Sequence, residues 1–328
     1  MPQKKSGKLA KFVVNDVVLP HRVNFMDGDL SRPDEQRGYP LSRHFSAIGS
    51  RISAVLLAGA AGIFVLPVSS QAAGFEMLRA HRAIYEVKLD KASDRSGIQN
   101  MTGRIVYELV GNACDGISVR YRFVSKVSAN GEMVTSDQQT ATFESADGKE
   151  YDFLTKSLVN EQLVKTVKGV ARKADGGIAV DIEEPARREV KLPDAEFISS
   201  HIIQVLDHAM KGDSFFSIDV FDGGEEADEV LRTTNVVGKE GAPDKPLPGE
   251  KADALAPLEG VRAWPVNIGY FKTNAQPGAE TLPVYEVSFT LYENGISRNL
   301  SMRYPDYSLN GTLVGLEMLD QGDCKPQK

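Results

Sequence analysis

The chain has 328 residues, of which 41% are hydrophobic and 25% charged, so it can bury a sizeable core. Its formal net charge is −7, and the part after residue 72 holds 29 basic and 40 acidic residues, a net of −11. This acidic balance argues against a nucleic-acid partner, because phosphate contacts need clustered Lys and Arg, and against adsorption to anionic lipid through charge.

The first 41 residues are polar and match no structural element. They would form an overlong positively charged region in front of a signal peptide. We therefore expect that translation starts near Leu41 and that residues 1–41 are a wrongly assigned N-terminal extension.

Residues 42–72 have the three parts of a secretory signal peptide. A segment with two arginines and no acid precedes the uncharged apolar run 52–68, and Ser70 and Ala72 are the small residues that signal peptidase accepts before a cleavage at Ala73. An uncleaved membrane anchor is the alternative, because 17 apolar residues lie at the lower limit for spanning a bilayer. We expect cleavage and a soluble periplasmic protein.

From residue 73 onward, alternating apolar and polar residues predict a mostly β protein. Val119, Tyr121 and Phe123 show this alternation within one strand, and Asn130-Gly131 supplies the positive φ that a tight hairpin needs. The predicted strands cover residues 81–89, 102–109, 117–127, 134–144, 151–158, 161–170, 178–182, 187–192, 215–221, 229–237, 264–272, 284–292, 297–304 and 312–319. About 14 strands predict one antiparallel β-spiral or partly open barrel.

One segment, residues 196–211, has apolar residues at helical spacing along one face. It predicts a single main helix that covers or plugs one face of the sheet. Either Asp194 or Ser199 is expected to cap its start, and Gly212 suits its end. Residues 239–262 are rich in Pro, Gly, Ala and charge and predict a long exposed or disordered loop within a single domain, residues 73–328.

Cys114 and Cys324 are the only cysteines, and both follow the signal peptide. An even number in an oxidising compartment favours a disulfide, and two free thiols are the alternative. A zinc site is excluded because no CxxC motif or nearby histidine completes four ligands.

Several stretches form a specific series when they are taken in order. They are 78–85 (LRAHRAIY), 96–97 (SG), 103–108 (GRIVYE), 192–193 (LP), the helix with His201, 220–223 (VFDG), 233–239 (TTNVVGK) and 264–266 (WPV), together with both cysteines. This series resembles the EipB family of alphaproteobacterial periplasmic cell-envelope integrity proteins, formerly a domain of unknown function. The resemblance covers about residues 74–325.

The resemblance implies a periplasmic β-spiral with a Cys114–Cys324 disulfide. It also implies a role in envelope integrity and stress resistance, without a known reaction. The implied fold is similar to that of periplasmic lipoprotein carriers, which hold acyl chains in a curved sheet, an analogy at the level of fold alone.

No nucleophile-elbow, HExxH, P-loop or dinucleotide-binding motif occurs after the signal peptide, so the residues indicate neither an enzyme nor a cofactor. Trp264 and His201 are the candidates for a cavity or a partner surface, although core packing is the favoured interpretation of both. His201 and His208 lie about 10 Å apart along the helix, too far for one metal ion. The acidic turn 222–229 is interpreted as a solvated hairpin tip, and no metal site is predicted.

Three functions stay open. We favour a non-enzymatic protein that binds an envelope component, such as a lipid, a lipoprotein, peptidoglycan or a periplasmic protein, in or on the curved sheet. A carrier or chaperone for lipid or lipoprotein is the alternative, and a hydrolase of envelope polymers is the least favoured because no motif supports it.

Overall fold

The computed structural model describes residues 74–224, 226–243, 245–273 and 282–324. The extension 1–41, the signal peptide 42–72 and the cleavage residues Ser70, Ala72 and Ala73 lie outside the described residues, so those expectations stay predictions.

Within the described residues, 14 strands form one antiparallel sheet in which consecutive strands pair, except that β8 and β9 form its two edges. The first strand, β1, pairs with the last, β14. The predicted mostly β fold is therefore confirmed, and the sheet is not closed. The strands are β1 (His81–Ala92), β2 (Ile98–Asn112), β3 (Gly116–Ala129), β4 (Glu132–Glu144), β5 (Glu150–Val159), β6 (Gln162–Ala174), β7 (Gly177–Glu184), β8 (Arg188–Leu192), β9 (Phe215–Val220), β10 (Leu231–Val237), β11 (Ala263–Lys272), β12 (Tyr285–Tyr292), β13 (Ser297–Arg303) and β14 (Tyr307–Met318).

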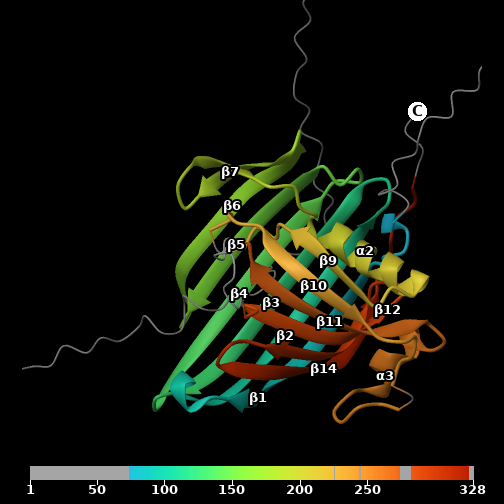
Figure 1. The fold of residues 1–328 in the computed structure, drawn as a ribbon. Coiled ribbons are helices and arrows are strands. Elements are labelled where there is room, and N and C mark those ends of the chain that lie inside the picture. Colours follow the sequence, from blue (N-terminus) through green and yellow to red (C-terminus); the bar gives the residue numbers. More distant parts are fainter. Residues whose placement is uncertain (1–73, 225, 244, 274–281, 325–328) are drawn as a thin grey trace, which may run out of the picture. The chain divides into compact units, whose positions relative to one another are not determined.

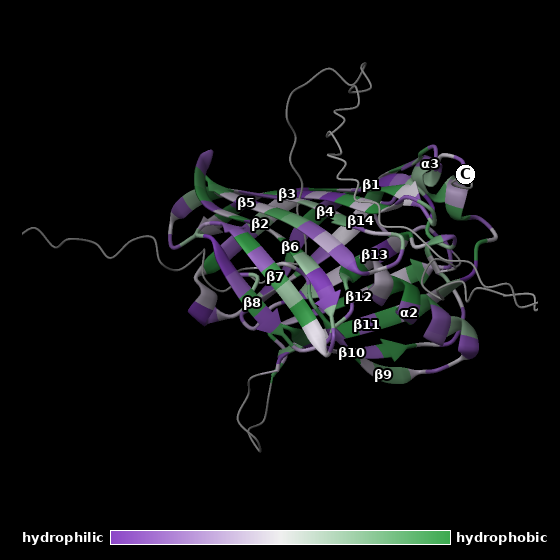
Figure 2. Ribbon diagram, turned by 90° about the horizontal axis from the view of Figure 1, so that it is seen from above, coloured by the Kyte–Doolittle hydropathy of each residue, from purple (hydrophilic) through white to green (hydrophobic). Residues whose placement is uncertain are grey.

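The sheet curls so that β1–β4 and β10–β14 face each other across the main core (Figure 1). Apolar and polar residues alternate along each strand (Figure 2), which places one apolar face inward. A second, smaller core joins Tyr151 and Phe153 on β5 to Phe197 and Phe221, beside the edge strand β9, whose Val220 is bridged by Glu196. The two ends of the sheet therefore overlap through packed side chains, as in a spiral.

The predicted helix is present as α2 (Ile198–Lys211), and its apolar face packs into the main core through Val205 and Leu206. Gly212 ends the helix with φ 83°, as its lack of a Cβ allows. No helix in the described ranges combines the length and the apolar character that crossing a membrane requires.

The predicted N-terminal caps of α2 are wrong. Neither Asp194 nor Ser199 caps the helix with its side chain, and the first backbone N–H groups instead donate to the carboxylate of Glu144, at the end of β4. A helix end that is buried against a sheet can be satisfied by a group far away in sequence, which a local capping rule does not detect.

The segment 239–262 differs from the exposed loop that its composition predicts. It contains α3 (Ala252–Leu255) and a 3-10 turn, η2 (Ala256–Leu258). Outside this segment, a further 3-10 turn, η1 (Asp94–Ser96), links β1 to β2. Ala254 and Leu258 are buried, and α3 packs against β14. A buried ion pair fixes the segment, with Arg298 Nε donating to Glu250 Oε1 at 2.6 Å.

Candidate functional site

A cavity of about 190 Å³ lies inside the curled sheet. Strands β1–β4 form one wall, β11–β13 form the other, and the first turn of α2 contributes Ile198, Ser199, His201 and Ile202. This volume is less than that of a typical small-molecule pocket, which is roughly 300–1,000 Å³. The cavity therefore suits one apolar segment of a larger molecule.

The walls of this cavity are mostly apolar, and among the described residues that line them none is Asp, Glu, Lys or Arg. Burial raises the pKa of the lining tyrosines, Tyr85, Tyr107, Tyr121 and Tyr270 among them, so these phenols stay neutral near pH 7. A charged group would lose its hydration here without gaining a partner of opposite charge.

His81, the first residue of β1, is 1% exposed and lines the cavity. Its Nδ1 lies 2.7 Å from the carbonyl oxygen of Arg79. Burial lowers the pKa of the imidazole, which leaves it neutral at pH 7. A neutral imidazole has one donor and one acceptor nitrogen, so its contact with a carbonyl assigns the proton.

Of the two residues predicted for a cavity or a partner surface, only His201 lies at this cavity. Its Nε2 is 3.1 Å from Asn235 Oδ1 on β10, within a buried network that includes Thr233. Trp264 does not line the cavity. It is packed in the main core, with the Arg262 guanidinium 5.2 Å from the centre of its ring.

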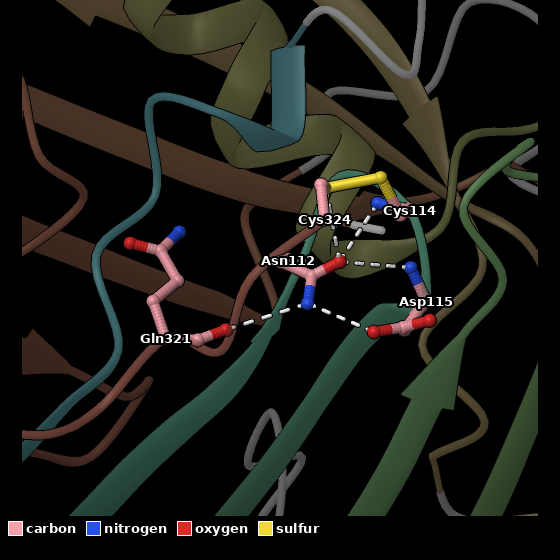
Figure 3. Close-up of a disulfide and its surroundings, with 5 residues drawn as sticks. All are labelled: Asn112, Cys114, Asp115, Gln321 and Cys324. Carbon is pink, nitrogen blue, oxygen red and sulfur yellow. Dashed lines mark hydrogen bonds between the residues drawn. A yellow bond between two sulfur atoms is a disulfide. The ribbon is translucent and has the colours of Figure 1, made fainter. Parts of the chain in front are cut away.

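The predicted disulfide between Cys114 and Cys324 is present, with Cα atoms 5.5 Å apart. Asn112 organises the turn after β2, because its Oδ1 accepts the backbone N–H groups of Cys114 and Asp115 at 2.8 and 2.9 Å (Figure 3). Its Nδ2 donates to the Gln321 carbonyl oxygen at 3.4 Å. The bridge therefore joins the β2–β3 turn to the C-terminal segment.

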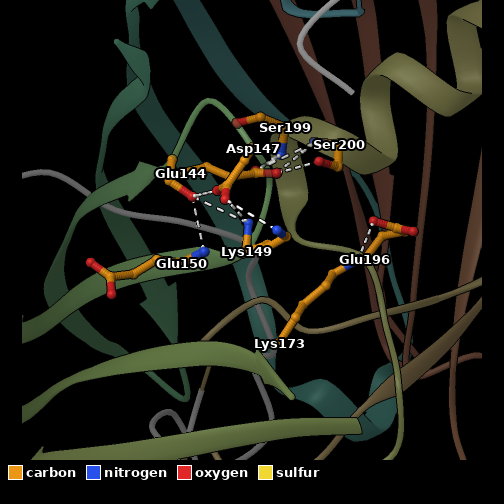
Figure 4. Close-up of polar contacts among 9 residues, drawn as sticks. Glu144, Asp147, Lys149, Glu150, Lys173, Glu196, Ser199 and Ser200 are labelled. Carbon is orange, nitrogen blue, oxygen red and sulfur yellow. Dashed lines mark hydrogen bonds and ion pairs between the residues drawn. The ribbon is translucent and has the colours of Figure 1, made fainter. Parts of the chain in front are cut away.

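Glu144 connects β4 to the helix that contributes to the cavity wall. Its carboxylate accepts the backbone N–H of Ser199 at 2.9 Å and contacts both the N–H and the hydroxyl of Ser200 (Figure 4). Burial raises the pKa of Glu144 to about 7, although these hydrogen bonds favour the charged form.

Glu144 was not among the residues predicted for the site. The period of two along β4 was the available signal, because it places Glu144 on the same face as Thr142, which lines the cavity. An acidic residue on an inward face needs a partner, and here the partner is a helix N-terminus. Within the described residues, no three His, Cys, Asp or Glu side chains are grouped closely enough to hold a metal ion.

Comparison with known proteins gives three consistent similarities. The model of the EipB-like family matches residues 72–320. The cell envelope integrity protein EipB of Brucella abortus (strain 2308) is 38% identical over 281 residues, which cover 85% of this chain and 96% of that protein. A crystal structure described as a β-barrel-like protein of domain of unknown function DUF1849, also from Brucella abortus, superposes with a TM-score of 0.69 at 38% identity. That comparison covers 74% of this chain and 99% of the other.

Proposed function

This chain belongs to the EipB-like family, and on that premise we propose that it supports the integrity of the cell envelope from the periplasm. It would do so by binding an apolar part of an envelope component inside the curled sheet. The name of the Brucella abortus relative supports the envelope role, and the predicted signal peptide supports the compartment.

The uncharged cavity between the two halves of the sheet carries the binding proposal. Each buried methylene contributes ~0.8 kcal/mol, so a short segment of about six would contribute about 5 kcal/mol, from which the cost of association is subtracted. The cavity alone would thus hold a ligand weakly, and tighter binding would need contacts outside it.

Weak, reversible retention also fits the second candidate function, a carrier or chaperone that releases its lipid or lipoprotein cargo. No observation favours the third, a hydrolase. Glu144 and Ser200 pair a carboxylate with a hydroxyl, but neither is among the residues that line the cavity.

A cavity-filling substitution tests the proposal. Val119 lies on β3 between Leu109 and Thr142 of the flanking strands, and all three line the cavity, so Val119→Phe would fill part of it. The matched control is Val124→Phe, because Val124 lies on the same strand and on its opposite, half-buried face.

Both variants would be expressed in a strain that lacks the gene, and survival in detergent and in a cell-wall antibiotic would be measured. We expect Val124→Phe to restore resistance and Val119→Phe to fail, with both proteins folded by circular dichroism. Full restoration by a folded Val119→Phe would refute binding in the cavity. If that variant does not fold, Val287→Phe on the opposite wall replaces it.

A further inference from the structure

We propose that the cavity selects an uncharged ligand group that carries a hydrogen-bond donor, an amide N–H or a hydroxyl, and that Nε2 of His81 accepts this hydrogen bond. The inference rests on the proposed function and deepens it by naming the chemical class of the ligand. The class is an acyl or alkyl chain with an amide or hydroxyl group, as opposed to a free carboxylate.

The first step is to determine which ring nitrogen of His81 carries the proton. A backbone carbonyl can only accept a hydrogen bond, so Nδ1, 2.7 Å from the Arg79 oxygen, must be the donor. In the neutral ring, Nε2 then carries a lone pair and no proton. Tautomer and ring orientation are thus set by the backbone of the segment that leads into β1.

The second step is the surroundings of Nε2. Within the described part of the chain, the contact with Arg79 is the only hydrogen bond of the His81 side chain, and the Tyr107 ring lies beside it with centroids 5.5 Å apart. The side chain is buried, yet it lines the cavity. Nε2 is not among the fully buried polar atoms without a partner in the described part of the chain, so it is accessible from the cavity. A ligand that supplies a donor gains a hydrogen bond there that a ligand without a donor does not.

The third step is the lack of charge in the lining. A carboxylate inside the cavity would face the acceptor nitrogen of the neutral His81 imidazole and tyrosine hydroxyls. No Lys or Arg is among the described residues that line the cavity. The carboxylate would lose its hydration without gaining a partner of opposite charge. An amide or a hydroxyl on the same chain loses far less hydration and matches the acceptor.

Three ligands with the same eight-carbon chain test the donor and the lack of charge together, and the variants below isolate the acceptor. Octanamide and octan-1-ol carry a donor and no charge, whereas octanoate is charged at pH 7.5. Binding to the mature protein, emptied of any copurified ligand, would be measured by isothermal titration calorimetry. We expect octanamide and octanol to bind about tenfold more tightly than octanoate, in line with one buried hydrogen bond and an avoided desolvation.

The matched variants are His81→Phe, which keeps a ring of similar size without the acceptor, and His208→Phe, which changes a histidine that is not among the lining residues. We expect His81→Phe to bind octanamide several-fold more weakly and His208→Phe to behave as the wild-type protein.

Equal affinity of the wild-type protein for all three ligands would overturn the inference and leave the proposed function standing. Binding of none of them would count against the proposed function itself. Because the comparison of ligands uses the wild-type protein, it decides the question even if His81→Phe does not fold. An unchanged affinity of folded His81→Phe for octanamide would also overturn the inference.

Discussion

Replacing Glu144 with Gln should change how the stability of the fold depends on pH. The substitution keeps the size of the side chain and an oxygen that can accept the N–H groups of Ser199 and Ser200, but it removes the titrating group. The folded protein raises the pKa of Glu144 to about 7, against a reference value of 4.5, because burial disfavours its charged form.

The sign follows from proton binding. Between pH 4.5 and 7 the folded state holds a proton on Glu144 that the unfolded state has largely lost, so the contribution of this group to the free energy of unfolding falls as pH rises through that window. Below pH 4.5 and above pH 7 the contribution is nearly constant. The free energy of unfolding changes by about 1.4 kcal/mol for each pH unit only between the two pKa values and by less near each of them. The total loss between pH 5 and pH 8 is therefore about 2.5 kcal/mol.

Urea unfolding at pH 5 and pH 8 would measure this loss. Other carboxyl groups also titrate, so the informative quantity is the stability of the wild-type protein minus that of Glu144→Gln, which should fall by about 2.5 kcal/mol from pH 5 to pH 8. Glu150→Gln is the control, since the side chain of Glu150 is 44% exposed beside Arg172. The stability of the wild-type protein minus that of Glu150→Gln should change much less between the two pH values. A difference for Glu144→Gln that is the same at both pH values would refute the reasoning.

Two other substitutions test the disulfide and the segment 239–262. Cys114→Ser opens a bridge with a sequence separation of 210, which the chain-entropy model values at about 5 kcal/mol, or a fall in melting temperature of about 10 °C for a domain of this size. A melting temperature that does not respond to the substitution or to a reductant would contradict a structural role. Arg298→Met leaves Glu250 buried and unpaired, which should cost about 3–5 kcal/mol and speed proteolysis within 239–262. Adding Glu250→Leu should recover most of that loss, and a double variant no more stable than Arg298→Met would argue against a buried pair.

The strands were predictable because each carries its own signal. Alternation marks inward residues such as Tyr121 and Phe123, and Gly131 stands at a turn where φ is 81°. The two cysteines could be paired without a structure, since no others follow the predicted signal peptide. The strands and turns depend on residues that are neighbours in sequence, and the disulfide depends on the number of cysteines.

The candidate site was less predictable because its parts meet only after the sheet curls. Glu144 and Ser199 are 55 positions apart in the chain, and no local pattern joins a strand end to a helix N-terminus. The composition of residues 239–262 indicated exposure, but one buried contact with Arg298 fixes that segment to β13. The cavity itself depends on how closely two sheet halves approach, which alternation does not determine.

Native mass spectrometry of the protein purified from its own cells tests the central claim most directly. We expect the wild-type protein and Val124→Phe to carry an added mass that is released by organic solvent and identified as a molecule with an apolar chain. Val119→Phe should carry none. An empty wild-type protein, or the same added mass on a folded Val119→Phe, would contradict binding of an envelope component in the cavity.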